Sequence, residues 1–271
     1  MKSILLHVQD DDSLDSRLQA ALSLARAAEG HLRCLHVTPI EAYVAFDGFG
    51  GVFVMQDVMN GIDEHESQLR QRIEGQLAKE DVSWDYQQIT GNIANVIVSR
   101  AALADVIVVG RDYHHDTHAV SPISLIGDLL QRSRTPLLVP PVSGATFDPT
   151  GPTVIAWDGG YEAANAVRGT LGLLKLASKV EVVRVDAEAE KMFPATELLE
   201  YLSRHGIHAE LRVEAAADEL VPAAILTCAE QIGATSLIMG GYGHSRIGEL
   251  IFGGVTRTFL EKAPIALVIA H

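Results

Sequence analysis

The sequence predicts an α/β fold in which a doubly wound parallel sheet occurs twice along the chain. Short apolar strand-like runs alternate with helix-like segments over most of the 271 residues, and such alternation is typical of right-handed β-α-β crossovers. The strand-like runs are almost continuously apolar, as in Asp105–Gly110 and Ser236–Gly240, which favours a parallel sheet covered on both faces. These two runs correspond to each other, as do Ile4–Val8 and Val154–Trp157, so the pattern indicates one fold repeated.

A connecting segment separates the two copies. Prolines, glycines and small polar residues gather in Pro140–Pro152, a composition typical of a surface linker. We therefore expect one domain at residues 1–141 and another at 152–271, called the first and second halves below.

In the first half, the alanine-rich run Leu14–Ala28 predicts a helix, Leu32–Val37 predicts the next strand, and Thr135–Val139 predicts the last strand. In the second half the strands are expected at Val154–Trp157, Val180–Val185, Ala209–Val213, Leu237–Met239 and Ile265–Ile269, and the helices at Ala163–Leu176, Ala195–His205, Leu220–Ile232 and Val255–Lys262.

The first half has extra residues between its second and third strands. Matching strands lie about 148–150 positions apart early in each half and about 128–130 apart later, which leaves roughly 20 extra residues. The segment Ala42–Gly61 accounts for them, and it contains Phe46, Phe49, Val52, Phe53 and Met55. It is either a helix or flap over the first core, or an apolar surface for a partner or lipid-like ligand.

Composition excludes several classes of function. The formal net charge of -14 argues against nucleic acid or an anionic membrane as a partner. The apolar start of the chain is too short for a signal peptide, and no run is long enough to span a bilayer. Cys34 and Cys228 are expected as buried small hydrophobes. We expect a soluble cytoplasmic protein.

The stretch Gly240–Gly254 is the strongest candidate for a binding site. It lies between the apolar run Leu237–Met239 and a helical pattern that starts at Val255. Glycines let the backbone turn and approach a ligand, and the start of a helix offers free N–H groups to an anion. The alternative is a glycine-rich turn with a structural role alone.

Asp158 is a second candidate, because it ends the first strand of the second half. Ligands of doubly wound sheets bind beyond the carboxyl ends of the strands. If its strand neighbours the one that ends at Gly240, Asp158 could bind a ribose or base while the glycine loop holds phosphates. The alternative is a helix-capping or turn carboxylate.

The spacing Gly240-x-x-Gly243, nine residues, then Gly253 resembles the nucleotide-binding motif of the universal stress protein family. The likeness covers the whole chain as a tandem pair, weakly in the first half and strongly in the second. It implies two tandem Rossmann-like (adenine nucleotide alpha hydrolase-like) domains, each a five-stranded parallel sheet with helices on both faces. It also implies a stress-response regulatory protein whose second domain binds ATP or ADP, with or without Mg²⁺.

Carried over by position, the resemblance puts Asp158 at the adenosine and Gly240, Gly243 and Gly253 at the phosphates. His244 and Arg246 could contact phosphate or form a loop ion pair. The full expected nucleotide site comprises Asp158, Gly240, Gly243, His244, Ser245, Arg246, Gly253, Gly254, Val255 and Thr256.

The sequence departs from the family pattern at three places. Gly254 stands where the family has Ser or Thr, so a hydroxyl contact would have to come from Thr256 or Ser245. In the first half, Gln9 stands at the position of Asp158, and Arg111 follows Gly110 without a second glycine. We therefore expect nucleotide in the second half alone.

No catalytic residues or metal site are predicted. Phosphate-loop, dinucleotide and nucleophile-elbow motifs are absent from the sequence. The cluster of His114, His115 and His118 is expected as a solvated loop, with a metal site as the alternative. A ligand-free interaction module and a weak ATPase stay open as alternative functions.

The last strand of each half ends in an apolar run, Leu137–Val139 and Ile265–Ile269. Because such edges pair readily, we expect the halves to join sheet to sheet as a pseudo-dimer. A further homodimer of two chains stays open.

Overall fold

A computed structural model of the chain describes residues 1–39, 52–111, 122–141, 146–186, 193–215, 220–241 and 254–271. The first half contains the strands β1 (Ser3–Val8), β2 (His31–Pro39), β3 (Ser83–Gly91), β4 (Val106–Val108) and β5 (Leu137–Val139). Its helices are α1 (Leu14–Ala28), α3 (Val52–Leu77), α4 (Ile93–Arg100) and α5 (Pro122–Arg132), with a short 3₁₀ turn, η2, at Ala101–Leu103.

The second half repeats this alternation. Its strands are β6 (Thr153–Ala156), β7 (Val180–Asp186), β8 (Ala209–Ala215), β9 (Ser236–Gly240) and β10 (Ala266–Ala270). Its helices are α6 (Tyr161–Gly169), α7 (Leu171–Leu174), α8 (Ala195–Arg204), α9 (Val221–Gln231) and α10 (Gly254–Lys262). The helix expected at Ala163–Leu176 is divided at Thr170, whose hydroxyl bonds to the carbonyl of Ala166 at 2.6 Å.

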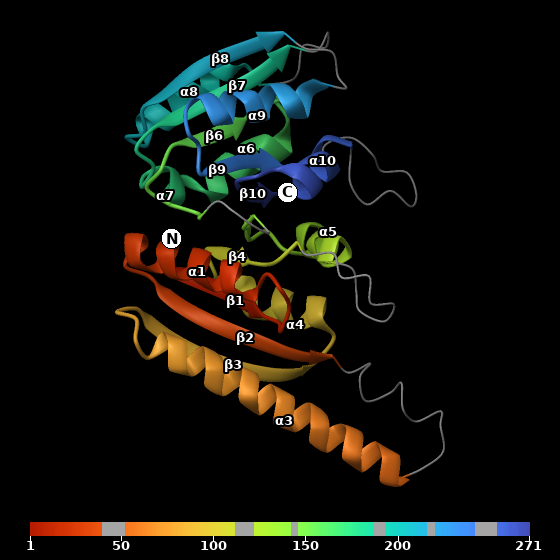
Figure 1. Cartoon of the computed structure of the whole chain (residues 1–271). Coiled ribbons are helices and arrows are strands. Elements are labelled where there is room, and N and C mark those ends of the chain that lie inside the picture. Colours follow the sequence, from red (N-terminus) through yellow and green to blue (C-terminus); the bar gives the residue numbers. More distant parts are fainter. Residues whose placement is uncertain (40–51, 112–121, 142–145, 187–192, 216–219, 242–253) are drawn as a thin grey trace.

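All ten strands form one sheet in the order β3-β2-β1-β4-β5-β10-β9-β6-β7-β8. Strands within each half pair in parallel. The doubly wound α/β fold expected from the sequence is confirmed. Figure 1 shows the two halves stacked along the sheet, with the first half below and the second above.

The halves join where β5 and β10 pair antiparallel, with Val139 opposite Leu267 and Leu137 opposite Ile269. The expected sheet-to-sheet junction of the two apolar last strands is therefore confirmed. Because β5 and β10 pair with each other, the last strand of neither half is left as an open sheet edge.

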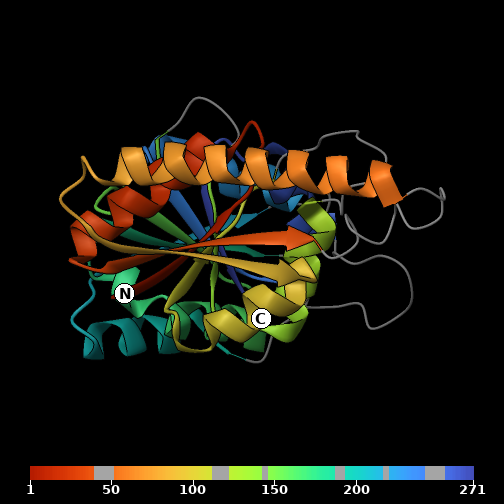
Figure 2. The same cartoon turned by 90° about the horizontal axis from the view of Figure 1, so that it is seen from below.

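Helices cover both faces of the sheet, as the view along it shows (Figure 2). Side chains of α1, α3, α6, α7 and α8 form one apolar core with the strand residues that point to that face, among them Ile4 and Leu6. Side chains of α4, α5, α9 and α10 form the other core, which Leu5 joins from the opposite face of β1. This alternation places successive strand residues in different cores.

The helix α3 is the largest difference between the halves. It has 26 residues, whereas its counterpart α8 has 10. The extra length includes part of the insertion expected at Ala42–Gly61, and this part is helical from Val52 onward. In Figure 1, α3 runs along the outer edge of the first half beside β3.

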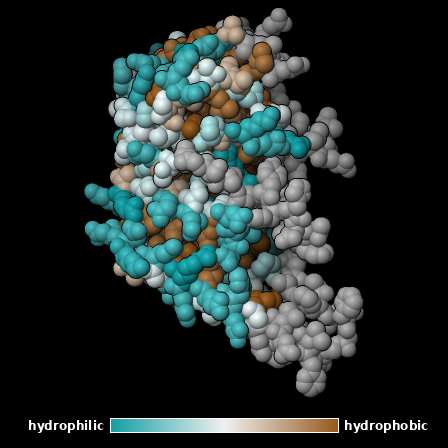
Figure 3. All heavy atoms as spheres, in the orientation of Figure 1, coloured by the Kyte–Doolittle hydropathy of each residue, from teal (hydrophilic) through white to brown (hydrophobic). Residues whose placement is uncertain are grey.

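Hydrophilic side chains cover much of the face seen in Figure 3, with apolar side chains visible between them. Cys34 and Cys228 are both buried and free, as expected. None of the helices in the described part of the chain has the length and apolar character to cross a membrane.

Candidate functional site

The strands β6 and β9 lie side by side and run in the same direction, with Thr153 opposite Ser236 and Ile155 opposite Ile238. Their carboxyl ends therefore meet at one edge of the sheet. This is the condition under which Asp158 and the glycine loop could share one ligand. Asp158 follows β6 by two residues, and Gly240 is the last residue of β9. The fold brings these two expected site residues to the same edge.

Asp158 is exposed and forms a tight turn at the end of β6. Its Oδ1 accepts a hydrogen bond from the backbone N–H of Gly160 at 2.8 Å, and Gly159 between them has a φ of 74°. A left-handed residue at this place favours glycine. Asp158 therefore has the turn-forming role that the sequence left open as an alternative. The turn also keeps its carboxylate at the carboxyl edge of the sheet.

Gly240 is required by packing. A Cβ at this position would lie 2.5 Å from the backbone N of Ala163 and 2.6 Å from the carbonyl carbon of Glu162. These contacts come from the first turn of α6, which passes directly over the end of β9. The absence of a side chain therefore lets the helix approach the strand, a role that the sequence analysis did not consider for this glycine.

The helix α10 begins at Gly254 and leads back to β10. Since α10 connects the parallel strands β9 and β10, its first turn starts on the carboxyl side of the sheet. Gly254 and Val255 are exposed, Thr256 is buried, and the first turn holds no acidic residue. A Cβ at Gly254 would meet nothing within 4 Å among the residues that the structure describes, so packing against those residues does not require glycine there.

Several expected residues lie outside the described ones: Gly243, His244, Ser245, Arg246 and Gly253 of the glycine stretch, His114, His115 and His118 of the histidine cluster, and the part of the insertion before Val52. Within the described ranges, no group of three or more His, Cys, Asp or Glu side chains is arranged to hold a metal ion.

The corresponding place in the first half is filled by protein. A Cβ at Gly110 would lie 2.2 Å from Nη1 of Arg17 and 2.5 Å from Oγ of Ser13. The Arg17 side chain is buried and donates to both carboxylate oxygens of Asp11, at 2.8 and 2.9 Å, and to the carbonyl of Gln9. An internal ion pair thus occupies the space above the end of β4.

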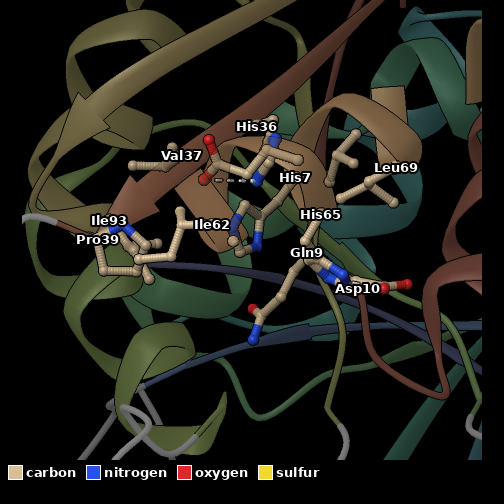
Figure 4. Close-up of a pocket in the computed structure, with 13 residues that line it drawn as sticks. His7, Gln9, Asp10, His36, Val37, Pro39, Ile62, His65, Leu69 and Ile93 are labelled. Carbon is tan, nitrogen blue, oxygen red and sulfur yellow. Dashed lines mark ion pairs between the residues drawn. The ribbon is translucent and has the colours of Figure 1, made fainter. Parts of the chain in front are cut away.

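A cavity of about 420 Å³ opens beside this ion pair, at the carboxyl ends of β1 and β2 (Figure 4). The helix α3 forms its wall on one side through Ile62, His65, Glu66 and Leu69. The remaining lining residues are His7, Val8, Gln9, Asp10, His36, Val37, Pro39, Gly61 and Ile93.

This cavity was not predicted from the sequence. Two signals pointed to it: His7 and His36 lie near the carboxyl ends of adjacent parallel strands, where ligand sites of this fold class occur. The part of the lining that α3 supplies could not be predicted from nearby residues, because it depends on how α3 packs against strand ends that are distant in sequence.

Burial changes the ionisation of the two strand histidines. Desolvation, with smaller contributions from the charge of Arg17 and from His36, lowers the pKa of His7 to about 3. Desolvation also lowers the pKa of His36, although the Glu66 carboxylate opposes the change. Both imidazoles are therefore neutral near pH 7.

No family model matches the sequence, and the search of curated proteins gives no match. Solved structures do resemble the fold. A universal stress protein from Archaeoglobus fulgidus superposes with a TM-score of 0.71 at 15% identity, over 99% of this chain and 96% of that chain.

Two Pseudomonas aeruginosa structures are also similar over the whole chain. One is a protein of unknown function, with a TM-score of 0.60 at 15% identity and coverage of 100% and 92%. The other is a candidate universal stress protein, with a TM-score of 0.53 at 15% identity and coverage of 100% and 93%. The resemblance read from the glycine stretch is thereby confirmed at the level of the fold.

Proposed function

We propose that this protein is a stress-response regulator that binds ATP or ADP in its second half. The base and ribose would lie near Asp158, and the phosphates near Gly240, Gly243, Gly253 and the first turn of α10. The regulatory part of the proposal rests on the universal stress protein fold. The nucleotide part rests on the site itself.

One observation supports the nucleotide site above the others: β6 and β9 are adjacent and parallel. Their adjacency gives Asp158 and the glycine stretch a common edge, the edge at which doubly wound sheets bind their ligands. The start of α10 adds backbone N–H groups without a carboxylate in the first turn to compete for them. Such a helix start favours a phosphate group.

The difference between the halves supports a single site. In the first half, the guanidinium of Arg17 and the hydroxyl of Ser13 lie against Gly110, and Asp11 neutralises the guanidinium. A phosphate at that place would have to displace a buried ion pair, which is costly. At the matching Gly240, the close neighbours are backbone and Cβ atoms of α6.

Extraction of nucleotide from the purified full-length protein tests the proposal. Denatured protein should release ATP or ADP, identified by chromatography, and Gly243→Val and Gly253→Val should each abolish its retention while leaving the melting temperature nearly unchanged. If the protein binds added ATP equally well with either substitution, the site is wrong. Binding of no nucleotide by the native chain would favour the ligand-free interaction module.

A phosphate-release assay separates binding from turnover. We expect no steady release of phosphate from ATP, since the described residues offer no paired nucleophile and base at this edge. Steady release that falls in Asp158→Ala would support the weak ATPase instead.

A further inference from the structure

The cavity under α3 has the proportions of a small-molecule site. Its volume of about 420 Å³ lies within the range of roughly 300–1,000 Å³ typical of such sites. Apolar side chains form about half of its lining, namely Val8, Val37, Pro39, Ile62, Leu69 and Ile93. A wall of this kind favours the hydrocarbon part of a ligand.

A buried carboxylate defines the polar part of the cavity. Glu66 is 7% exposed, and its two oxygens accept hydrogen bonds from the hydroxyl of Thr38 and the side-chain amide of Gln88. Both donors are neutral. The Nε2 of His36 lies 3.8 Å from Oε1 of Glu66, and both residues line the cavity.

The charge of Glu66 is not balanced by a neighbouring cation in the described part of the chain. His36 is neutral near pH 7 because burial lowers its pKa, and the nearby arginines have other partners. Arg72 pairs with Asp10 at 2.7 Å, Arg70 pairs with Glu74 at 2.8 Å, and the neighbouring His65 also pairs with Asp10, at 3.1 Å. A buried carboxylate without an opposite charge is costly, so a cation at this place would stabilise the protein.

His36 lies on the cavity lining beside this carboxylate. Its Nδ1 has almost no accessible surface, so Glu66 is the acceptor that a ligand in the cavity would meet. The Glu66 carboxylate also disfavours anions, which distinguishes this cavity from a site for nucleotide phosphates.

We propose that the cavity of the first half binds a small organic cation, with its ammonium group at Glu66 and its apolar part against Ile62, Val37 and Ile93. A primary amine with a compact hydrocarbon body fits both the charge and the wall. This site is separate from the nucleotide site and uses α3, the helix that is longer than its counterpart α8 in the second half.

Matched series of small molecules test the proposal on the full-length protein. Calorimetric titrations would compare butylamine, cyclohexylamine and 2-phenylethylamine with the alcohols and carboxylates of the same carbon skeletons. At least one amine should bind at least about tenfold more tightly than its alcohol, as expected for one buried charged hydrogen bond. The carboxylates should bind least. The proposal is overturned if no amine binds better than its matched alcohol.

Charge-neutralising variants identify the group responsible. Glu66→Gln should reduce the preference for amine over alcohol by at least about tenfold. Glu64→Gln removes the same charge from an exposed position on α3 and should retain the preference. Ile62→Trp fills the cavity and should block amine and alcohol alike, with its circular dichroism spectrum confirming the fold. Equal amine binding by the native protein and Glu66→Gln would contradict the proposal.

Discussion

At the scale of single residues, the glycines after β4 and at the end of β9 make room for two different neighbours. Gly110 leaves room for the guanidinium of Arg17, and Gly240 leaves room for the first turn of α6. A Cβ at Gly254 would meet no atom of the described residues within 4 Å. Among the described contacts, packing therefore restricts Gly110 and Gly240 but not Gly254.

Gly240→Ala should destabilise the protein by about 1–3 kcal/mol, because the added Cβ overlaps backbone atoms of α6 that cannot move independently. Gly254→Ala should change stability by less than about 1 kcal/mol, in the stabilising direction. Urea unfolding of both variants measures the difference. Equal stabilities for the two would show that α6 does not lie this close to β9.

Because His7 is buried, we predict that the folded protein loses stability in acid. Burial holds its pKa near 3 in the folded state, against an ordinary value of 6.5. Below pH 6.5 the unfolded chain therefore binds a proton that the folded chain does not. This contribution to stability is fully present above pH 6.5 and is lost as the pH falls toward 3, at up to about 1.4 kcal/mol per pH unit.

Urea unfolding between pH 7 and pH 4 measures this dependence, and His7→Gln should flatten it. The matched control is His205→Gln, which removes an exposed imidazole and should keep the acid slope of the native protein. A slope that stays the same in His7→Gln would mean that another group controls the response to acid.

At the scale of elements, strong local patterns were sufficient for most strands and helices. The apolar run Ser236–Gly240 is β9 in full, and the alanine-rich run Leu14–Ala28 is α1 in full. Both patterns depend on residues close in sequence, so periodicity determines them.

The position of the helix α3 could not be predicted from local sequence patterns. The strand offsets located the insertion, and the structure makes it helical from Val52. The turn containing Ile62, His65 and Glu66 then lies over the ends of β1 and β2 and closes a cavity. That arrangement comes from packing between distant segments, about which helix propensity gives no information.

The candidate nucleotide site could be predicted only in part. Its strand ends follow from the order of strands in a doubly wound sheet, and that order brought Asp158 and Gly240 to one edge. The packing role of Gly240 was not predictable, because it depends on the depth at which α6 crosses β9.

At the scale of the whole molecule, two halves with the same strand order share one sheet, and one arginine links them further. Arg111 follows Gly110 in the first half, is buried, and donates to the carbonyls of Phe259, Leu260 and Ala263 at the end of α10. A cation at a helix C-terminus meets carbonyls that have no partner within the helix. The residue that interrupts the family motif in the first half thus stabilises a helix of the second.

Arg111→Met should destabilise the protein by about 2–4 kcal/mol through the loss of these charged hydrogen bonds. Arg204→Met is the matched control, since it removes an exposed pair with Glu200 on α8 and should cost less than about 0.5 kcal/mol. Chemical denaturation followed by circular dichroism distinguishes the two. Similar losses in both variants would contradict a special role of Arg111 between the halves.

Calorimetric titration of ATP into the full-length protein and two aspartate variants tests the nucleotide site most directly. Gly254→Asp adds a carboxylate at the start of α10, where it should not harm the helix but should repel phosphate. Gly75→Asp adds the same charge at an exposed position of α3 with open space around it. We predict one ATP per native chain, unchanged affinity in Gly75→Asp, and affinity at least about tenfold lower in Gly254→Asp. Equal ATP affinity in both variants, or ATP that binds only in the first half, would contradict a phosphate site at the start of α10.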